Sequence, residues 1–169
     1  MTLTTHAIVG AAVASVVPQY PVAAFILAFL SHFAIDAIPH WHYPVSSVHI
    51  DQNDFRNSDM PINKDSLFDL VKIGCDALLG VLLSLFLFQS FRQPFQLSIL
   101  IGAFGGIIPD ALQFVYWKFR HEPLTTLQRF HMWIHADTDL DRRTVLGISL
   151  QTVLIIASVL LVKGIMTFQ

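Results

Sequence analysis

The chain has one cysteine, little charge and no surplus of basic residues. Cys75 alone excludes an internal disulfide and a cysteine-rich zinc cluster. Ten Lys and Arg against twelve Asp and Glu give a formal net charge of -2, so the sequence lacks the basic surplus that binds nucleic acid through its phosphates. The sequence also has no H-E-x-x-H motif, which excludes the glutamate base of a zincin metalloprotease.

Apolar residues dominate what is present. They make up 54% of the 169 residues, whereas charged residues make up 13%, and the mean hydropathy is +0.59. This composition is typical of a membrane protein rather than of a soluble domain. We therefore expect residues 1–169 to form a single helical membrane domain with an all-α fold, built from four to five apolar helices and one interfacial helix.

The apolar runs predict where the helices lie. Residues 7–17 and 21–38 should form a tight helical hairpin, because Pro18 and Pro21 each remove a backbone donor between them. Each half is shorter than the roughly 20 residues that cross a hydrocarbon core. Longer runs follow at 65–91, 96–117 and 145–168. We expect Pro109 to interrupt the middle one.

Two polar segments separate the long runs, a loop at 41–64 and an interfacial segment at 118–143. If the helices alternate across a membrane, both segments lie on the same face. They hold seven of the ten cations, namely Arg56, Lys64, Lys118, Arg120, Arg129, Arg142 and Arg143. By the positive-inside rule, that face is predicted to be cytoplasmic.

Three side chains near the end of the hairpin form a pattern that can hold a metal ion. His32, Asp36 and His40 are spaced by four residues, which places them along one stripe of a helix. Deprotonated imidazole and carboxylate groups both offer lone pairs to a divalent metal. The same spacing also fits a simple His–Asp hydrogen bond at a membrane interface, and both interpretations stay open.

A second pair of histidines repeats this spacing. His131 and His135 lie four residues apart in a helix-like stretch that Pro123 opens. Two histidines on an interfacial helix also occur without a metal, so this pair alone decides nothing.

Two aspartates lie within otherwise apolar runs. A carboxylate at the centre of a bilayer costs about 2.5–3.5 kcal/mol on insertion scales unless it is paired or hydrated. Asp76 can join Asp69 and Lys72 in an ion-pair cluster within one helix, which needs no metal. Asp110 has no basic neighbour within a turn, so its partner must come from elsewhere in the fold.

The alternating topology brings these groups toward one face, together with His6 at the start of the first helix. We therefore predict one divalent metal centre, of one to three zinc ions, with the ligand candidates His6, His32, Asp36, His40, Asp76, Asp110, His131 and His135. His40 or His131 is the expected proton shuttle, because imidazole titrates near neutral pH.

Four short motifs resemble a known family. Thr5-His6 before a small-residue helix, the run from His32 to His40, Pro109-Asp110, and the run from Phe130 to His135 resemble LexA-regulated, membrane-bound metal-dependent hydrolases. More remotely, the His-x-x-x-Asp helix pair is similar to zinc-dependent phospholipases C and related nucleases. The resemblance implies an all-helical fold, a bound divalent metal and a hydrolytic reaction, with His6, His32, Asp36, Asp110, His131 and His135 as ligands.

The sequence departs from that family at two places. The run Asp36-Ala37-Ile38-Pro39-His40 lacks the second aspartate of the family's D-x-D-H-like cluster. The pair His131 and His135 is not followed by the family's Thr-His-Ser pattern. Both departures bear on the number of metals and on activity.

We expect the centre to hydrolyse a phosphoester, with a membrane lipid such as a phospholipid as substrate, at the cytoplasmic face of a prokaryotic inner membrane. A metal-ion or proton transporter is the first alternative. A transporter needs a path from both faces, yet residues 89–105 and 155–169 contain no acidic residue or histidine. A metal-stabilised structural protein is the second alternative.

Overall fold

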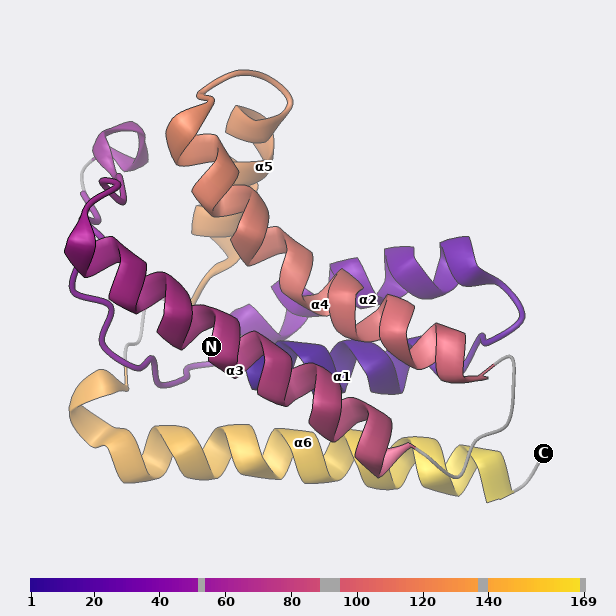
Figure 1. Ribbon diagram of the computed structural model, residues 1–169. Helices are drawn as coiled ribbons and strands as arrows, with labels where there is room; N and C mark the ends of the chain where they lie inside the picture. The colour runs from indigo at the N-terminus through magenta and orange to yellow at the C-terminus, as the bar shows by residue number, and fades with distance from the viewer. Residues whose placement is uncertain (52–53, 89–94, 137–139, 168–169) are drawn as a thin grey trace.

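The computed structural model describes residues 1–51, 54–88, 95–136 and 140–167 (Figure 1). The α-helices run α1 Leu3–Ala14, α2 Pro21–Asp36, α3 Lys64–Leu87, α4 Phe95–Lys118, α5 Leu124–Ile134 and α6 Thr144–Thr167, with short 3-10 turns at Phe55–Asn57 and Asp141–Arg143. Helices account for 75% of the described residues, which confirms the all-α prediction.

Three helices of the described chain, α3, α4 and α6, are long and apolar enough to cross a membrane. The predicted hairpin of α1 and α2 is also apolar, but its helices are shorter. With 12 residues, α1 is about 18 Å long, which is less than the thickness of a hydrocarbon core. The predicted interfacial helix is α5.

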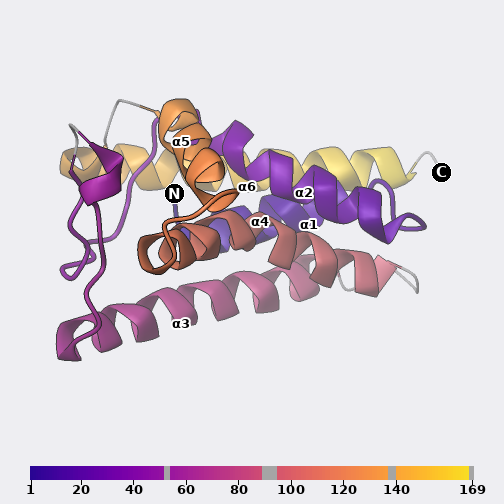
Figure 2. The ribbon, with the colours of Figure 1, turned by 90° about the horizontal axis from the view of Figure 1, so that it is seen from above.

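The short helix α1 lies at the centre of the molecule. Ten of its 12 residues are buried, including all those from Thr5 to Ala12. Figure 2 shows α3 and α6 on opposite sides of α1. Small residues allow this arrangement, because alanine and glycine on every side of α1 let other helices approach it.

Glycines bring the backbones of α1 and α4 into direct contact. A Cβ atom on Gly106 would meet the carbonyl oxygen of His6, and a Cβ atom on Gly10 would meet the carbonyl oxygen of Gly102. Any larger side chain at these positions must push the two helices apart. The close approach therefore fixes His6 against the part of α4 that precedes Asp110.

Pro109 lies inside α4 and does not end it, so the predicted interruption there is wrong. Proline cannot donate to the carbonyl of Gly105, four residues earlier. The next carbonyl, that of Gly106, accepts a hydrogen bond from His32 Nδ1 at 2.8 Å. This bond links α2 to the turn of α4 that contains Pro109.

The two polar segments contact each other, as the alternating topology requires. Lys118 Nζ lies 2.7 Å from a carboxylate oxygen of Asp59 and donates to the carbonyl of Met60. The backbone N–H of Leu140 donates to the carbonyl of His40 at 3.2 Å. Residues 52–53 and 137–139 of these segments lie outside the described residues. The remaining parts form one polar end of the helical domain.

Candidate metal centre

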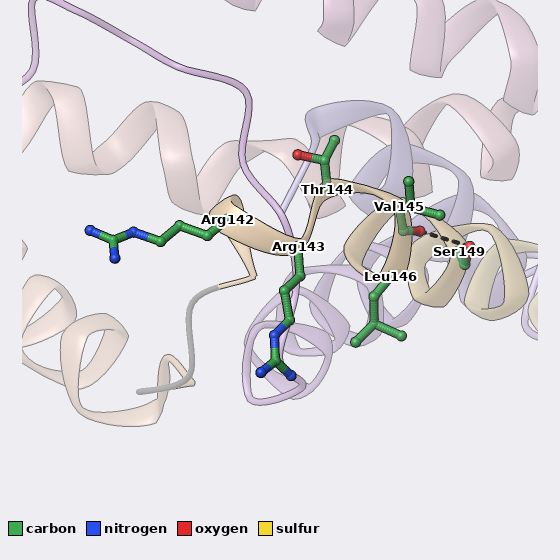
Figure 3. A pocket seen from close by; sticks show the side chains of 6 residues that line it. All are labelled: Arg142, Arg143, Thr144, Val145, Leu146 and Ser149. Carbon is green, nitrogen blue, oxygen red and sulfur yellow. Dashed lines mark hydrogen bonds between the residues drawn. The ribbon is translucent and has the colours of Figure 1, made fainter.

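A surface hollow of about 640 Å³ at the start of α6 contains none of the predicted ligands. It is lined by Arg142, Arg143, Thr144, Val145, Leu146 and Ser149. Figure 3 shows that the side chains of Arg142 and Arg143 point away from each other. The candidate chemistry lies elsewhere, in a densely packed region where α1, α2, α4 and α5 meet.

Asp36 lies at the centre of a buried group that we call the carboxylate cluster, comprising His32, Asp36, Asp110 and His131. Asp36 Oδ2 lies 3.1 Å from His32 Nε2 and 3.1 Å from His131 Nε2. Asp110 Oδ1 lies 3.7 Å from His32 Nε2 and 3.9 Å from His131 Nε2. One ligand atom from each of the four residues lies within 4.8 Å of all the others, so a single metal ion could contact all four residues.

His6 of α1 contacts the other carboxylate oxygen of Asp36, Oδ1. Its ring stacks on that of His32 with 3.9 Å between the ring centroids. Its Nε2 atom lies 3.2 Å from Asp36 Oδ1. Five of the eight predicted ligands therefore converge from four helices, namely His6, His32, Asp36, Asp110 and His131.

His131 Nε2 lies at hydrogen-bond distance from Asp36 Oδ2, but other polar atoms of this centre have no such partner among the described residues. Within the described part of the chain, both ring nitrogens of His6 and the Oδ1 atom of Asp36 are buried without a hydrogen-bond partner. Leaving one such atom unpaired costs about 1–3 kcal/mol. Imidazole nitrogen and carboxylate oxygen are the ligand atoms that zinc prefers beside thiolate, so the residues present fit a divalent metal.

The tautomer of His32 strengthens this conclusion. Its Nδ1 atom faces the carbonyl of Gly106, which can only accept, so Nδ1 carries the proton and Nε2 carries a lone pair. That Nε2 atom lies 3.1 Å from Asp36 Oδ2, which is also an acceptor, and 3.3 Å from His131 Nε2. The two acceptors need a proton or a metal ion near them, and His131 Nε2, 3.1 Å from Asp36 Oδ2, can supply the proton when no metal is bound.

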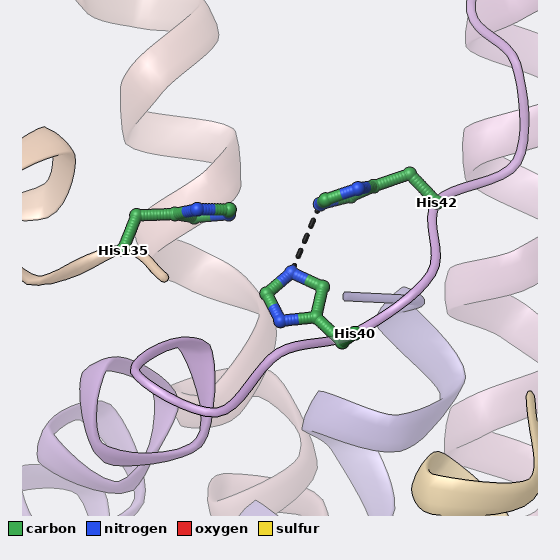
Figure 4. Close-up of side chains that lie close together, drawn as sticks. All are labelled: His40, His42 and His135. Carbon is green, nitrogen blue, oxygen red and sulfur yellow. Dashed lines mark hydrogen bonds between the residues drawn. The ribbon is translucent and has the colours of Figure 1, made fainter. Parts of the chain in front are cut away.

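A second group, which we call the histidine trio, comprises His40, His42 and His135 (Figure 4). His40 Nε2 and His42 Nε2 are 2.9 Å apart. The rings of His42 and His135 stack, with centroids 5.5 Å apart, and the His40 ring lies edge-on to both. One ligand atom from each residue lies within 4.8 Å of the other two.

The trio is adjacent to the carboxylate cluster but has a different environment. His40 Nε2 lies 3.8 Å from Asp36 Oδ1. The side chain of His42 is 37% exposed, whereas that of Asp36 is 2% exposed. Burial lowers the pKa of His40 to about 3 and also lowers the pKa of His135, so both rings are neutral near pH 7.

The sequence did not separate these two groups. We predicted His40 and His135 in one centre with Asp36, whereas the structure brings both toward His42, which we did not predict. His42 does not follow the four-residue spacing of a helix. Its signal is its position two residues after His40, since alternate residues of an extended segment point to the same side.

Asp76 lies in a different environment from the one we predicted. Its carboxylate accepts hydrogen bonds from the backbone N–H groups of Leu3 at 2.7 Å and Thr4 at 3.2 Å. The Thr4 hydroxyl donates to the same carboxylate at 2.6 Å. Asp76 therefore caps the N-terminus of α1, where a negative charge is favourable, and belongs to neither of the two groups found among the described residues.

The ion pair of Asp69 and Lys72 was anticipated from their spacing and is present at 3.0 Å. Asp69 also accepts hydrogen bonds from the backbone N–H and the hydroxyl of Ser47. This contact ties the 41–64 loop to α3. The predicted ion pair of Asp69 and Lys72 is therefore present, and Asp76 does not take part in it.

Gln151 of α6 is a positioning residue that sequence reasoning missed. Its Oε1 atom accepts hydrogen bonds from the hydroxyls of Thr2 and Thr5, each at 3.1 Å. Its Nε2 atom donates to the carbonyl of Trp41 at 2.9 Å. One side chain thus connects the start of α1, which carries His6, to the segment between His40 and His42.

These contacts define a centre built from residues of four helices, which lie far apart in the sequence. None of the family models, curated proteins or solved structures compared with this chain matches it.

Proposed function

We propose that this chain is a membrane-embedded, metal-dependent hydrolase that cleaves a phosphoester of a lipid-like substrate. The observation that carries the proposal is the convergence of buried imidazole and carboxylate groups on Asp36, with His6 and Asp36 atoms that have no hydrogen-bond partner among the described residues. The α-ammonium of Met1, 3.5 Å from Asp36 Oδ1, offsets part of the cost of burying this group. A zinc ion bound by the imidazole and carboxylate groups would offset the rest.

A divalent ion held there would polarise a phosphoryl oxygen and lower the pKa of a water molecule toward neutrality. Both histidines that we predicted as proton shuttles are better placed as ligands, since His131 faces two carboxylates and His40 faces His42. Asp110 is the most exposed carboxylate of the cluster, with 30% of its side chain accessible. It is therefore the group best placed to accept a proton from water that arrives from outside.

An apolar hollow beside the centre supports a lipid-like substrate. It has a volume of about 240 Å³ and is lined by Met1, Ile38, Pro39, Leu150, Gln151, Val153, Leu154 and Ala157. Ile38 and Pro39 directly precede His40, so one end of the hollow adjoins the candidate ligands. An acyl chain fits such a lining, because its methylene groups prefer apolar contact to water.

We further propose that the centre faces the cytoplasm of a prokaryotic cell, on the basis of the positive-inside rule. Single cysteines introduced as Gln19→Cys and His121→Cys in a Cys75→Ser background test this orientation, because both positions are exposed and lie in connections at opposite ends of the fold. An impermeant thiol reagent should label the Gln19→Cys protein in intact cells and spare the His121→Cys protein. The reverse pattern would contradict the orientation.

Asp110 distinguishes the hydrolase from the transporter. Asp110→Asn keeps the size of the side chain but removes its negative charge, and should lower turnover of a phospholipid or phosphodiester substrate by about 100-fold or more. Asp65→Asn is a matched control, since Asp65 is exposed in the first turn of α3 and should leave turnover unchanged. The assay uses purified protein in mixed micelles. Metal or proton flux through the parent protein in sealed proteoliposomes, without hydrolysis, would overturn the proposal in favour of transport.

A further inference from the structure

We infer that the histidine trio binds a second metal ion, distinct from the ion of the carboxylate cluster, and that this second ion keeps a coordination position open to an external anion. The inference rests on the proposed metal centre but does not require hydrolysis. His42, which does not follow the four-residue spacing of the other histidines, belongs to this second site and not to the carboxylate cluster.

Hydrogen bonds fix the tautomers of two members of the trio. His40 Nδ1 lies 2.6 Å from the carbonyl oxygen of Ile38, and His135 Nδ1 lies 3.2 Å from the carbonyl oxygen of Ala136. A carbonyl oxygen can only accept, so each Nδ1 atom carries the proton. Both Nε2 atoms therefore carry lone pairs, which are the groups that bind a metal ion.

The third member, His42, is held by a carboxylate. Its Nδ1 atom lies 3.4 Å from Asp141 Oδ1, and its backbone N–H donates to the same oxygen at 2.7 Å. A carboxylate beside Nδ1 favours a proton on that atom and increases the basicity of Nε2. All three rings thus present Nε2 as the available ligand atom.

The lone pairs of His40 and His42 face each other, with 2.9 Å between the Nε2 atoms. Two lone pairs at this distance repel unless a cation lies near both. A shared proton would serve these two rings but not His135. A metal ion would serve all three, because two nitrogens bound to one zinc lie about 3.3 Å apart when each Zn–N bond is about 2.0–2.1 Å.

The backbone around the trio is anchored before any ion binds. The carbonyl of His40 accepts from Leu140 N–H, and the carbonyl of Trp41 accepts from Gln151 of α6. The N–H of Ala136, beside His135, donates to the carbonyl of Asp36 at 2.9 Å. Three elements therefore hold the ligands near their binding positions, which lowers the entropy cost of forming the site.

The two groups differ in ligand number and exposure. The carboxylate cluster offers four ligands, and His32 and Asp36 among them have 0% and 2% of their side chains exposed. The trio offers three ligands, and 37% of the His42 side chain is exposed. Zinc sites with three protein ligands keep a fourth position for water or substrate. The trio therefore leaves a coordination position for an external anion.

Metal content of the intact chain tests this inference. The parent protein, reconstituted with Zn²⁺ in detergent and freed of excess metal, should bind two ions per chain, and His42→Ala should bind one. His49→Ala is the matched control, since His49 is an exposed histidine of the same loop that pairs with Asp59 only through its backbone, and it should bind two. His42→Asn, which preserves polarity, provides a second test if His42→Ala does not fold.

A second readout tests the open position. In the Co²⁺-substituted parent protein, added azide or inorganic phosphate should change the visible absorption spectrum, and His42→Ala should lose this response while its remaining cobalt bands persist. Equal metal content in the parent and in His42→Ala would contradict the inference. It would indicate that the trio holds a shared proton instead of a metal ion. If the parent binds one ion and still hydrolyses a phosphoester, the inference fails and the proposed function stands. If the parent binds no ion, both fail.

Discussion

Asp36 and Asp76 are both aspartates on apolar helices that contact α1, yet their surroundings have opposite character. Asp76 meets donors, the backbone N–H groups of Leu3 and Thr4 and a threonine hydroxyl. Asp36 meets histidine nitrogens, with His6 at 3.2 Å and His32 at 3.1 Å, and its Oδ1 atom has no hydrogen-bond partner among the described residues.

The difference shows that a carboxylate in an apolar segment does not by itself mark a metal site. A backbone N–H is a permanent donor, so the negative charge of Asp76 is compensated by the helix that it caps. Neutral His32, whose Nδ1 atom is engaged by the Gly106 carbonyl, offers only an acceptor to Asp36, so this pair needs a donor or a metal ion beside it. His131 Nε2 lies 3.1 Å from the same carboxylate oxygen, and the α-ammonium of Met1 lies 3.5 Å from the other one. The nature of the partner, rather than burial, separates a structural aspartate from a candidate ligand.

Metal removal should have the largest effect and should separate the two regions. An ion present at 1,000 times its dissociation constant adds about 4 kcal/mol to the stability of the folded state. We therefore expect a chelator to lower the thermal unfolding temperature of the parent and of Asp76→Ala, and to lower that of Asp36→Asn by less, because Asp36→Asn keeps only the ion of the histidine trio. Unfolding in detergent followed by circular dichroism measures this. A chelator effect of the same size in Asp36→Asn would remove the distinction between the two aspartates.

A smaller effect is expected where α4 holds His6 in place. Gly106→Ala puts a Cβ atom against the His6 carbonyl, which should cost about 1–3 kcal/mol and lower the affinity for metal. Gly74→Ala is the matched control, because no atom lies within 4 Å of its added Cβ, and should be neutral or stabilising by up to about 1 kcal/mol. Unfolding and metal titration of both variants provide the measurement. Unchanged metal affinity in Gly106→Ala would show that the close helix contact does not position the centre.

The smallest effect is expected at the α1 cap. Asp76→Ala leaves donors of α1 without an acceptor and should cost about 0.5–2 kcal/mol. Asp76→Asn keeps one acceptor oxygen and should cost less. Metal bound per folded chain should stay equal to that of the parent in both variants. A loss of metal from Asp76→Asn with unchanged stability would return Asp76 to the ligands that we first predicted.

Local patterns predicted most of the helices. The apolar run at 65–91 corresponds to α3 at Lys64–Leu87, and the run at 145–168 corresponds to α6 at Thr144–Thr167. The paired prolines 18 and 21 marked the end of one hairpin helix and the start of the next. Pro109 was misjudged because a proline can lie inside a helix that its neighbours hold by packing, and no local pattern reveals that packing.

The candidate site was predictable only in part. Alternation of helices was enough to bring Asp110 and His131 toward Asp36, although they lie far apart in sequence. The role of Asp76 was not predictable, because its donors belong to a helix more than 70 residues earlier. Gln151 was missed for the same reason, since it acts through a tertiary contact with Trp41. His42 was missed because its two-residue spacing from His40 does not follow the helical period on which the prediction rested.

The most direct test of the account is the amount of divalent metal bound to the purified, Zn²⁺-reconstituted chain, measured by elemental analysis for the parent, Asp36→Asn and Asp76→Asn. We predict that the parent and Asp76→Asn bind the same amount of metal, at least one ion per chain, and that Asp36→Asn loses the ion of the carboxylate cluster. A folded parent protein without bound metal, or full metal content in Asp36→Asn, would contradict the central claim.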